Sequence, residues 1–334
     1  MNFAATLLQW FKNNGRSLPW RETNDAYAIW LSEVILQQTR IAQGMSYWER
    51  FMAQWSTVND LAAATEDEVL KAWQGLGYYS RARNLHTAAQ QVVELGGFPQ
   101  TFKELKTLTG VGDYTAAAIA SIAFGEPVAV VDGNVYRVLS RYFGIDTPID
   151  STEGKKEFQA LAQSLLPINE PADYNEAIMD FGATQCTPNS PHCSACPLCE
   201  TCVAFREQRI NELPVKSKKV KQRERHFTYL YIEYEGKIAI HQRGAGDIWQ
   251  GLWELPQAEQ LTSSKDSIWE TEAQLLRKGV KHILTHQILL ADIYLWQPTR
   301  RPQLPSEFIW IEKQDLENYA LPRLIEILLK AVPA

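Results

Sequence analysis

Residues 108–134 contain groups that could bind a phosphate and supply a carboxylate within a short length of chain. Gly110 and Gly112 stand one residue apart between two helical patterns, and glycine permits backbone angles that other residues avoid. A hairpin here, with free N–H groups and the start of the next helix, predicts a phosphate site. Asp132 ends an apolar run, where it could take part in catalysis or simply cap a helix over 134–143.

A second carboxylate, Glu33, lies in an apolar stretch that predicts a helix from about Tyr27 to Gln43. Because carboxylates are seldom buried without a partner, one in such surroundings suggests a function. The alternative is that Glu33 faces solvent, and the sequence pattern alone slightly favours that alternative.

All five cysteines lie between Cys186 and Cys202. Six residues separate Cys186 from Cys193, two separate Cys193 from Cys196, and five separate Cys196 from Cys202, with Cys199 as a fifth thiol. Disulfides are rare in cytoplasmic proteins, and thiolates this close need a metal to hold them. Both zinc and an iron–sulfur cluster accept four cysteines, and the spacing alone does not decide between them.

The segment 75–84 combines glycines, two tyrosines and two arginines. Such a loop could insert a ring between nucleic-acid bases and hold phosphates. The alternative is an ordinary helix start with solvated arginines.

The composition indicates a folded protein of two domains. The chain has 334 residues, 45% of them hydrophobic and 11% aromatic, and no apolar run is long enough to span a bilayer. The N-terminus lacks the features of a signal peptide, so we expect a cytoplasmic protein. The formal net charge of −6 counts mildly against nucleic-acid binding, although six of residues 216–225 are Lys or Arg.

Helical patterns fill the first part of the chain, which predicts an all-α domain. They occupy 3–13, 27–43, 46–55, 57–63, 66–74, 80–95, 101–108, 113–124, 134–143, 153–165 and 172–182, with a loop at 18–21. Strands then fit 226–234, 237–241, 287–296 and 307–311, and helices fit 265–278 and 321–331. We therefore predict a helical domain over 1–213, a basic linker over 214–225 and a mixed α and β domain over 226–334.

Taken together, these motifs resemble the adenine DNA glycosylase (MutY) family of helix-hairpin-helix DNA glycosylases. The resemblance covers nearly the whole chain, and it is carried by the motifs at 19–21, 32–39, 75–81, 108–112, 131–135 and 249–256 and by the cysteine spacing. It implies an all-α core of two helical lobes, a six-helix barrel and an iron–sulfur lobe, followed by an α+β Nudix-like domain.

The resemblance also implies an activity: removal of adenine paired with 8-oxoguanine or guanine in double-stranded DNA, as a step of base excision repair by a monomer. Glu33 would protonate the base, Asp132 would stabilise the oxocarbenium ion, and Asn134 and Tyr114 would position the sugar and Asp132. Relatives that also cleave the strand carry a lysine where this chain has Tyr114, so we expect a monofunctional enzyme.

Further residues match binding positions of the family. The adenine pocket would be lined by Leu18, Trp20, Arg21 and Glu176, the wedge residues would be Gln38 and Tyr78, and Thr39, Gly110 and Gly112 would complete the DNA contacts. Thr285 and His286 match the lesion-recognition loop, although Leu284 replaces its aromatic residue, and His282 lies nearby. The [4Fe–4S] cluster would be held by Cys186, Cys193, Cys196 and Cys202, leaving Cys199 outside the set.

Three other functions compete with this interpretation. A thymine mismatch glycosylase would share the helical lobes but lack the second domain. A non-catalytic DNA-binding module would explain the hairpin and the cysteines but not Glu33 and Asp132 together. A nucleotide pyrophosphatase would need an acidic helix, whereas the segment 267–278 offers only Glu270 and Glu272.

Overall fold

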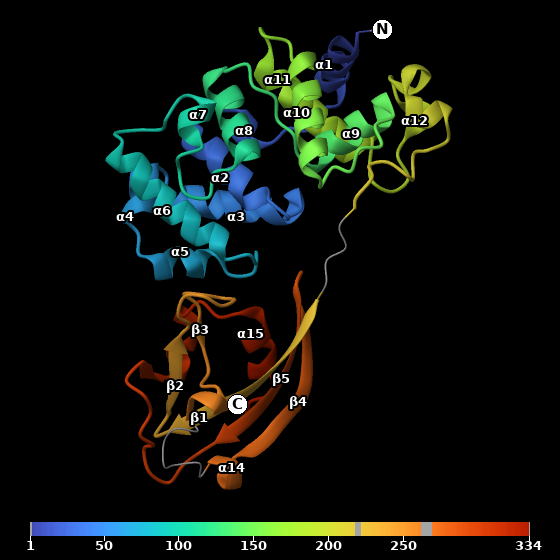
Figure 1. Ribbon diagram of the computed structural model, residues 1–334. Coiled ribbons are helices and arrows are strands. Elements are labelled where there is room, and N and C mark those ends of the chain that lie inside the picture. The colour runs from blue at the N-terminus through green and yellow to red at the C-terminus, as the bar shows by residue number, and fades with distance from the viewer. Residues whose placement is uncertain (1, 218–221, 262–268, 334) are drawn as a thin grey trace. The chain divides into compact units, whose positions relative to one another are not determined.

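The computed structural model describes residues 2–217, 222–261 and 269–333, which fall into two compact units (Figure 1). One unit contains the described residues up to 62 together with 87–217, and the other contains 63–86 together with the described residues from 222 onward. The predicted domain boundaries differ from this grouping, because residues 63–86 pack with the C-terminal part of the chain.

The first unit is helical, as predicted. Its elements are α1 (Phe3–Asn14), η1 (Pro19–Arg21), α2 (Ala26–Leu36), α3 (Ile41–Gln54), α4 (Val58–Ala63), α7 (Phe102–Leu105), α8 (Asp113–Phe124), α9 (Gly133–Phe143), α10 (Thr152–Leu165), α11 (Pro171–Asp180), η2 (Phe181–Gln185), η3 (Cys193–Ala195), η4 (Cys199–Thr201) and α12 (Val203–Arg206). Helix α6 (Ser80–Glu94) begins in the second unit and ends in the first.

The prediction of one helix over 27–43 was wrong. Helix α2 ends at Leu36 and α3 begins at Ile41, with Gln38 between them at a φ of 59°. A residue in this left-handed region cannot continue a right-handed helix. The break matters because it places Thr39 and Arg40 in a turn beside α2 rather than along it.

Two helices at the centre of this unit are apolar nearly all round, which is typical of helices buried in a core. Residues Ala26 to Ile35 of α2 are all buried, and Asp25 caps the helix by accepting from the N–H of Tyr27. Helix α8 is rich in alanine, and these small side chains let it pack between α2 and α11. The core around α8 continues through α1, α9, α10 and α11.

The predicted hairpin lies between α7 and α8. Gly110 has a φ of 75°, which a residue with a side chain adopts only at a cost, so the turn requires glycine there. Gly112 has a φ of −92°, and a Cβ added to it would meet nothing within 4 Å. Only one of the two glycines is therefore demanded by the backbone of this structure.

The second unit contains a mixed sheet in the order β3-β2-β1-β5-β4, with β6 also paired to β2. The elements are α5 (Glu66–Trp73), the first part of α6, β1 (Arg223–Tyr234), β2 (Lys237–Gln242), β3 (Trp253–Glu254), α13 (Ala258–Leu261), α14 (Trp269–Glu272), β4 (Gln274–Ile283), β5 (Gln287–Trp296), β6 (Phe308–Glu312), η5 (Lys313–Asn318) and α15 (Arg323–Leu329). Strands β1 and β5 run parallel, and β1 turns into β2 at Glu235 and Gly236, as predicted.

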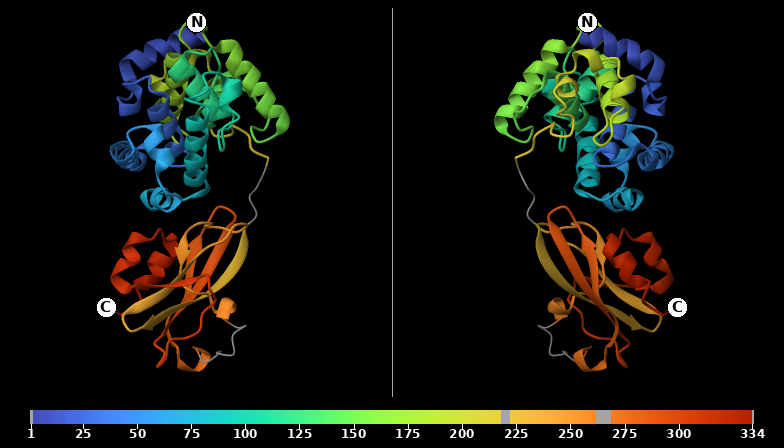
Figure 2. Two further views of the ribbon diagram at one scale, coloured as in Figure 1. Left: turned by 90° about the vertical axis from the view of Figure 1, so that its left-hand side faces the viewer. Right: turned by 90° about the vertical axis from the view of Figure 1, so that its right-hand side faces the viewer.

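Alternating side chains give this sheet two apolar faces. On one face, Ile238, Ile240 and Leu289 pack against Leu324 and Leu328 of α15, which Figure 2 shows lying against the sheet. On the other face, Leu230, Ile232 and Trp296 pack with Leu261 and Trp269. Both faces are thus covered, as expected for a sheet that contains parallel strands.

The predicted helix over 265–278 was wrong in its second half. Residues 274–278 belong to β4, an edge strand that pairs antiparallel with β5, and only α14 is helical before it. Residues 265–268 lie outside the described part of the chain. Pairing with the long strand β5 overrides local helical preference here, because strand formation depends on the neighbouring strand more than on the segment itself.

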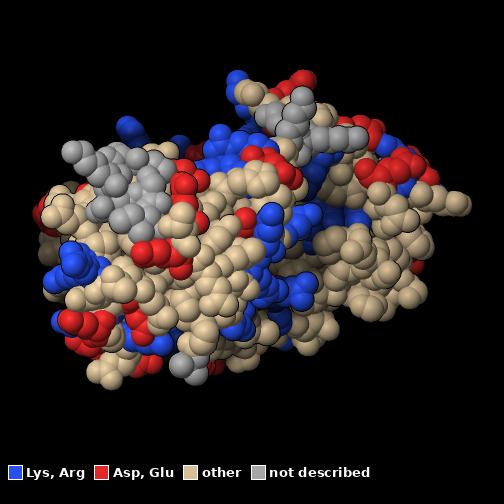
Figure 3. All heavy atoms as spheres, turned by 90° about the horizontal axis from the view of Figure 1, so that it is seen from below, with Lys and Arg blue, Asp and Glu red and all other residues tan. Residues whose placement is uncertain are grey.

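Positive charge is unevenly distributed despite the negative total. On the face shown in Figure 3, Lys and Arg side chains gather in patches, while neutral side chains cover large areas beside them. In the described ranges, the helices are all too short or too polar to cross a membrane.

Candidate active site

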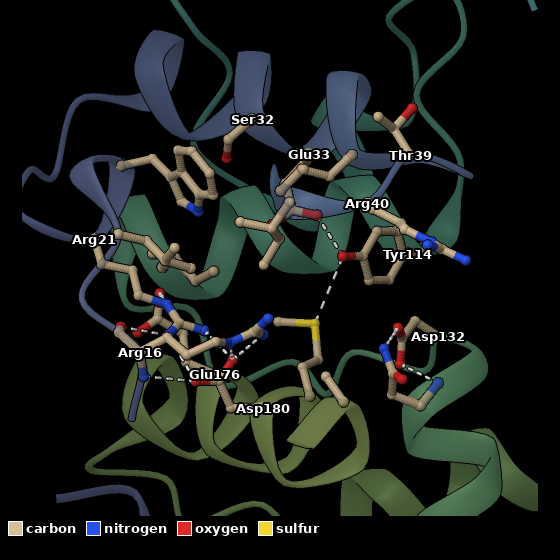
Figure 4. Close-up of a pocket in the computed structure, with 18 of the residues that line it drawn as sticks. Arg16, Arg21, Ser32, Glu33, Thr39, Arg40, Tyr114, Asp132, Glu176 and Asp180 are labelled. Carbon is tan, nitrogen blue, oxygen red and sulfur yellow. Dashed lines mark hydrogen bonds and ion pairs between the residues drawn. The ribbon is translucent and has the colours of Figure 1, made fainter. Parts of the chain in front are cut away.

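The first unit contains a cavity of about 640 Å³, bounded by η1, α2, α8, α9 and α11 (Figure 4). Several residues singled out in the sequence converge there: Leu18, Trp20, Arg21, Glu33, Thr39, Tyr114, Asp132, Asn134 and Glu176. The walls combine apolar side chains with a few polar groups, which is the usual composition of a site for a small organic group such as a base.

Glu33 is 9% exposed, so the solvent-facing alternative is wrong. The hydroxyl of Tyr114 donates a hydrogen bond to Glu33 Oε2, and Figure 4 shows the two side chains pointing toward each other. Burial raises the pKa of Glu33 from 4.5 to about 7, and the nearby carboxylates of Asp132 and Glu176 add to the rise. Glu33 therefore holds its proton close to neutral pH.

Asp132 occupies the N-cap position of α9, so the capping interpretation is confirmed. Its carboxylate accepts from the N–H groups of Asn134 at 2.9 Å and Val135 at 2.8 Å, and from Asn134 Nδ2 at 2.7 Å. Burial raises the pKa of Asp132, while these three donors and Arg137 oppose the rise by favouring the ionised form. Burial thus raises the pKa of both carboxyl groups, and Asp132 has more hydrogen-bond donors opposing the rise than Glu33 has.

A buried charge cluster forms the opposite wall. Arg21 donates through Nη1 and Nη2 to both oxygens of Asp180, at 2.9 and 2.8 Å, and its Nε lies 3.2 Å from Glu176 Oε1. Arg16 also binds Asp180. Arginine donors hold the pKa of Asp180 at about 2, whereas burial raises the pKa of Glu176 to about 7.

Arg16, Asp180 and Arg137 were not among the site residues predicted from the sequence. Arg137 is buried and donates to the carbonyl groups of Cys186 and Gly182, at 2.7 and 2.6 Å, and to Asn134 Oδ1 at 2.8 Å. It thereby connects the start of the cysteine loop to the residue that binds Asp132. The available signal for Arg137 was a charged residue inside an apolar helical pattern, and the same signal marked Glu33.

Gly182 makes this connection possible. A Cβ at that position would lie 2.6 Å from the Cβ of Asn134, so only glycine allows η2 to approach α9 this closely. The approach brings the carbonyl of Gly182 within reach of Arg137.

Other predicted residues lie elsewhere. Gln38, Gly110 and Gly112 are in the first unit but outside the residues that line this cavity. Within the second unit, a cavity of about 650 Å³ is lined by Tyr78, Leu284, Thr285 and His286, and the hydroxyl groups of Tyr78 and Thr285 lie 2.5 Å apart. His282 packs its ring 6.2 Å from that of Trp249.

The five cysteines line one small cavity in the first unit. Burial raises the pKa of Cys196 to about 12 and also raises the pKa values of Cys193 and Cys202, with repulsion from neighbouring thiolates adding to each rise. Thiolates gathered in this way are unfavourable unless a cation holds them. Within the described ranges, no three His, Cys, Asp or Glu side chains are placed to hold a single metal ion.

Comparison with known proteins agrees with this fold. Residues 31–167 match the HhH-GPD superfamily of base excision DNA repair proteins, and residues 228–331 match the NUDIX domain. A solved structure of a thermostable thymine-DNA glycosylase is 32% identical, with a TM-score of 0.57 over 61% of this chain and 95% of that one. The molecule therefore combines a helix-hairpin-helix glycosylase core with a Nudix-like domain, as the sequence predicted.

Two curated relatives define the family more narrowly. An adenine DNA glycosylase from Buchnera aphidicola subsp. Baizongia pistaciae is 30% identical over 88% of this chain and 84% of its own length. The adenine DNA glycosylase of Homo sapiens is 47% identical over 63% of this chain, although the chain spans only 40% of that relative. The chain belongs to the adenine DNA glycosylase family.

Proposed function

We propose that this protein is a monofunctional DNA glycosylase that removes adenine paired with 8-oxoguanine or guanine in double-stranded DNA. One observation carries the proposal: Glu33, buried with a raised pKa, shares a cavity with Asp132, whose three hydrogen-bond donors favour the ionised form. An acid and an anion beside one cavity are what cleavage of a glycosidic bond needs.

In the proposed reaction the adenine leaves the base stack and enters this cavity. Glu33 donates its proton to N7 of adenine, which makes the base a better leaving group. The carboxylate of Asp132 stabilises the positive charge that develops on the sugar, and Asn134 and the start of α9 hold that carboxylate in place. Glu33, once deprotonated, then accepts a proton from the attacking water.

Tyr114 accounts for the proposed absence of strand cleavage. Its hydroxyl donates to Glu33 and also lies 3.5 Å from Met179 Sδ, so the ring is fixed between α2 and α11. A phenol at this position cannot form the Schiff base that a lysine would form with the sugar.

We propose that the cavity of the second unit reads the opposite strand. Tyr78 is 52% exposed and has a φ of 48°, a combination common at functional sites. Together with Thr285 and His286 it offers hydroxyl and imidazole groups that can contact the oxygen at C8 and the proton at N7 of 8-oxoguanine. Each such contact contributes roughly 1–3 kcal/mol of discrimination.

The shared cavity of the cysteines supports a [4Fe–4S] cluster held by Cys186, Cys193, Cys196 and Cys202. A single zinc ion would draw its four sulfur ligands to about 2.3 Å from one point, whereas a cluster needs them further apart. The preference for a cluster over zinc rests on the resemblance of the cysteine spacing to that of the family. The cysteines that bind the cluster would fix the loop that follows α11, next to Arg137.

The proposed division of the chain is a catalytic domain over 1–213, a linker over 214–225 and a lesion-reading domain over 226–334, with two departures: β1 already begins at Arg223, and Tyr78 of the first range belongs to the lesion-reading cavity. Strand scission after hot alkali tests the activity on three duplexes, carrying A opposite 8-oxoguanine, A opposite G, and T opposite G. We expect cleavage of the first two only. Cleavage of the T–G duplex at a comparable rate would instead favour a thymine mismatch glycosylase, the activity named for the similar solved structure.

The double variant Thr285→Ala with His286→Ala tests the role of the second cavity. The ratio of single-turnover rates and of dissociation constants for 8-oxoguanine and guanine opposite A should fall by about tenfold or more. Leu284→Ala, on the same loop, serves as a control for disturbance of the loop. An unchanged ratio in the double variant would show that the lesion is read by other residues.

A further inference from the structure

Asp180 has no place in the chemistry proposed above, yet it is the most fully satisfied carboxylate of the cavity wall. Its side chain is 0% exposed and accepts hydrogen bonds from Arg21 Nη1 and Nη2, from Arg16 Nε, and from the N–H of Arg16. A buried carboxylate costs free energy unless it is paired. Two arginines meet that need here, so Asp180 stays ionised.

The guanidinium of Arg21 is divided between two carboxylates. Both terminal nitrogens bind Asp180, in the bidentate geometry that arginine and carboxylate prefer. Only Nε remains for Glu176, and it makes a single contact of 3.2 Å. One oxygen of Glu176 is therefore left without a bond to Arg21, although the side chain lies on the cavity wall.

The surroundings of Glu176 do not force it to ionise. Arg21 of η1 favours the ionised form of Glu176, while Asp180 and Asp173 of the same helix and Glu33 of α2 disfavour it through repulsion. Burial opposes ionisation further, and the pKa of Glu176 rises to about 7. At neutral pH this carboxyl group can thus both donate and accept a hydrogen bond.

We propose that Asp180 is a positioning residue for base removal: it holds Arg21 by both terminal nitrogens and so leaves Glu176 available to the extruded base. This inference rests on the proposed function, because it requires that a base enters the cavity. A neutral carboxyl group can donate to a ring nitrogen of adenine and accept from its amino group at the same time. Without Asp180, Arg21 would turn both terminal nitrogens to Glu176 and convert it into an ion-paired carboxylate.

Asp180→Asn tests the inference, because an amide offers one uncharged acceptor oxygen where the carboxylate offers two charged ones. Its effect should be seen in the pH dependence of the single-turnover rate. The single-turnover rate should decline at high pH as Glu33 and Glu176 each lose a proton. Glu176→Gln should remove the part of the decline that is due to Glu176. In Asp180→Asn that decline should move to lower pH by about one unit or more, since a bidentate opposite charge favours the ionised form.

The rate itself should fall by about tenfold or more at pH 7.5, with the dissociation constant for the duplex nearly unchanged, because small misplacements in a site can cost up to about 100-fold. Asp180→Glu keeps the charge and should restore part of the rate. Asn175→Ala is the matched control: Asn175 is buried on the same helix and binds Ser121 and the backbone at 128 and 130, away from the cavity. It should lower the melting temperature without moving the pH profile.

The possible results separate the two proposals. A wild-type protein that removes no adenine from any duplex overturns the proposed function. An active wild type, together with an Asp180→Asn variant that melts earlier but keeps the wild-type pH profile, overturns the role of Asp180. An Asp180→Asn variant that does not fold leaves the test to Glu176→Gln. A decline at high pH unchanged from the wild type in that variant would show that base removal does not use the Glu176 proton, and would equally refute the inference.

Discussion

Replacing Glu33 with glutamine should make the folded protein more stable at high pH while abolishing base removal. The pKa of Glu33 rises from 4.5 to about 7 on folding, so the folded state binds more protons than the unfolded state between these values. Ionisation of Glu33 therefore lowers the free energy of unfolding as the pH rises from 4.5 to about 7, and this effect does not grow further above about pH 7. A rise of about 2.5 units corresponds to roughly 3 kcal/mol at ~1.4 kcal/mol per unit.

Glutamine carries no charge at any pH, and its oxygen can still accept the hydrogen bond from Tyr114. Glu33→Gln should therefore match the wild type near pH 4.5 and exceed it by up to about 3 kcal/mol at pH 8. In a unit of this size that corresponds to a melting temperature about 6–12 °C higher. Single-turnover cleavage should fall at least ~100-fold, because the amide cannot supply the proton, while duplex binding persists.

Thermal unfolding at a series of pH values measures the difference directly. Glu157→Gln is a suitable control, because it removes one carboxylate at an exposed position on α10, outside the cavity. If the stabilisation by Glu33→Gln is the same at pH 5 and pH 8, Glu33 does not hold its proton in the folded state. The proposed proton donor would then have to be another residue.

Three further predictions follow from the same structure. Tyr114→Lys should introduce some strand cleavage, measured by borohydride trapping on substrate DNA; efficient trapping by the wild type would refute the monofunctional assignment. Cys199→Ser should keep the brown absorbance and iron content, whereas Cys186→Ser should lose them, and a colourless Cys199→Ser protein would mean that the ligand set is wrong. Arg137→Met should lower the free energy of unfolding by at least ~2 kcal/mol, since it leaves buried carbonyl groups without a donor; denaturant titration showing no loss would contradict this.

Local patterns were sufficient for most of the helices and for strands β1, β2, β5 and β6. The apolar period of α1, the cap of α9 and the turn at Glu235 and Gly236 depend on neighbours in the sequence, which a single sequence displays. Strand β4 was not predictable in this way, because its conformation depends on pairing with β5. The break after Leu36 was likewise hidden, since nothing local demands that Gln38 be left-handed.

The site was predicted through motifs, and its missing members are those that act through other residues. Glu33 and Asp132 occupy positions that a family resemblance identifies, whereas Asp180 and Arg137 bind side chains and carbonyl groups distant in the sequence. The distance from Arg21 to Asp180 along the chain is 159 residues, so only the folded structure reveals the pair. Charges inside apolar helices marked such residues as unusual but could not identify their partners.

The double role of Asp132 affects how variation at this position can be interpreted. As a helix cap it could be exchanged for Asn, Ser or Thr at a cost of about 1 kcal/mol or less, so many sequences would still fold. In its proposed role beside the sugar, the carboxylate has no such substitutes. A library of variants at this codon, scored once for protein abundance in cells and once for suppression of mutations, should therefore give two different tolerance profiles. Surveys that record only abundance would classify Asp132→Asn as harmless, although we expect that variant to lose the proposed base removal.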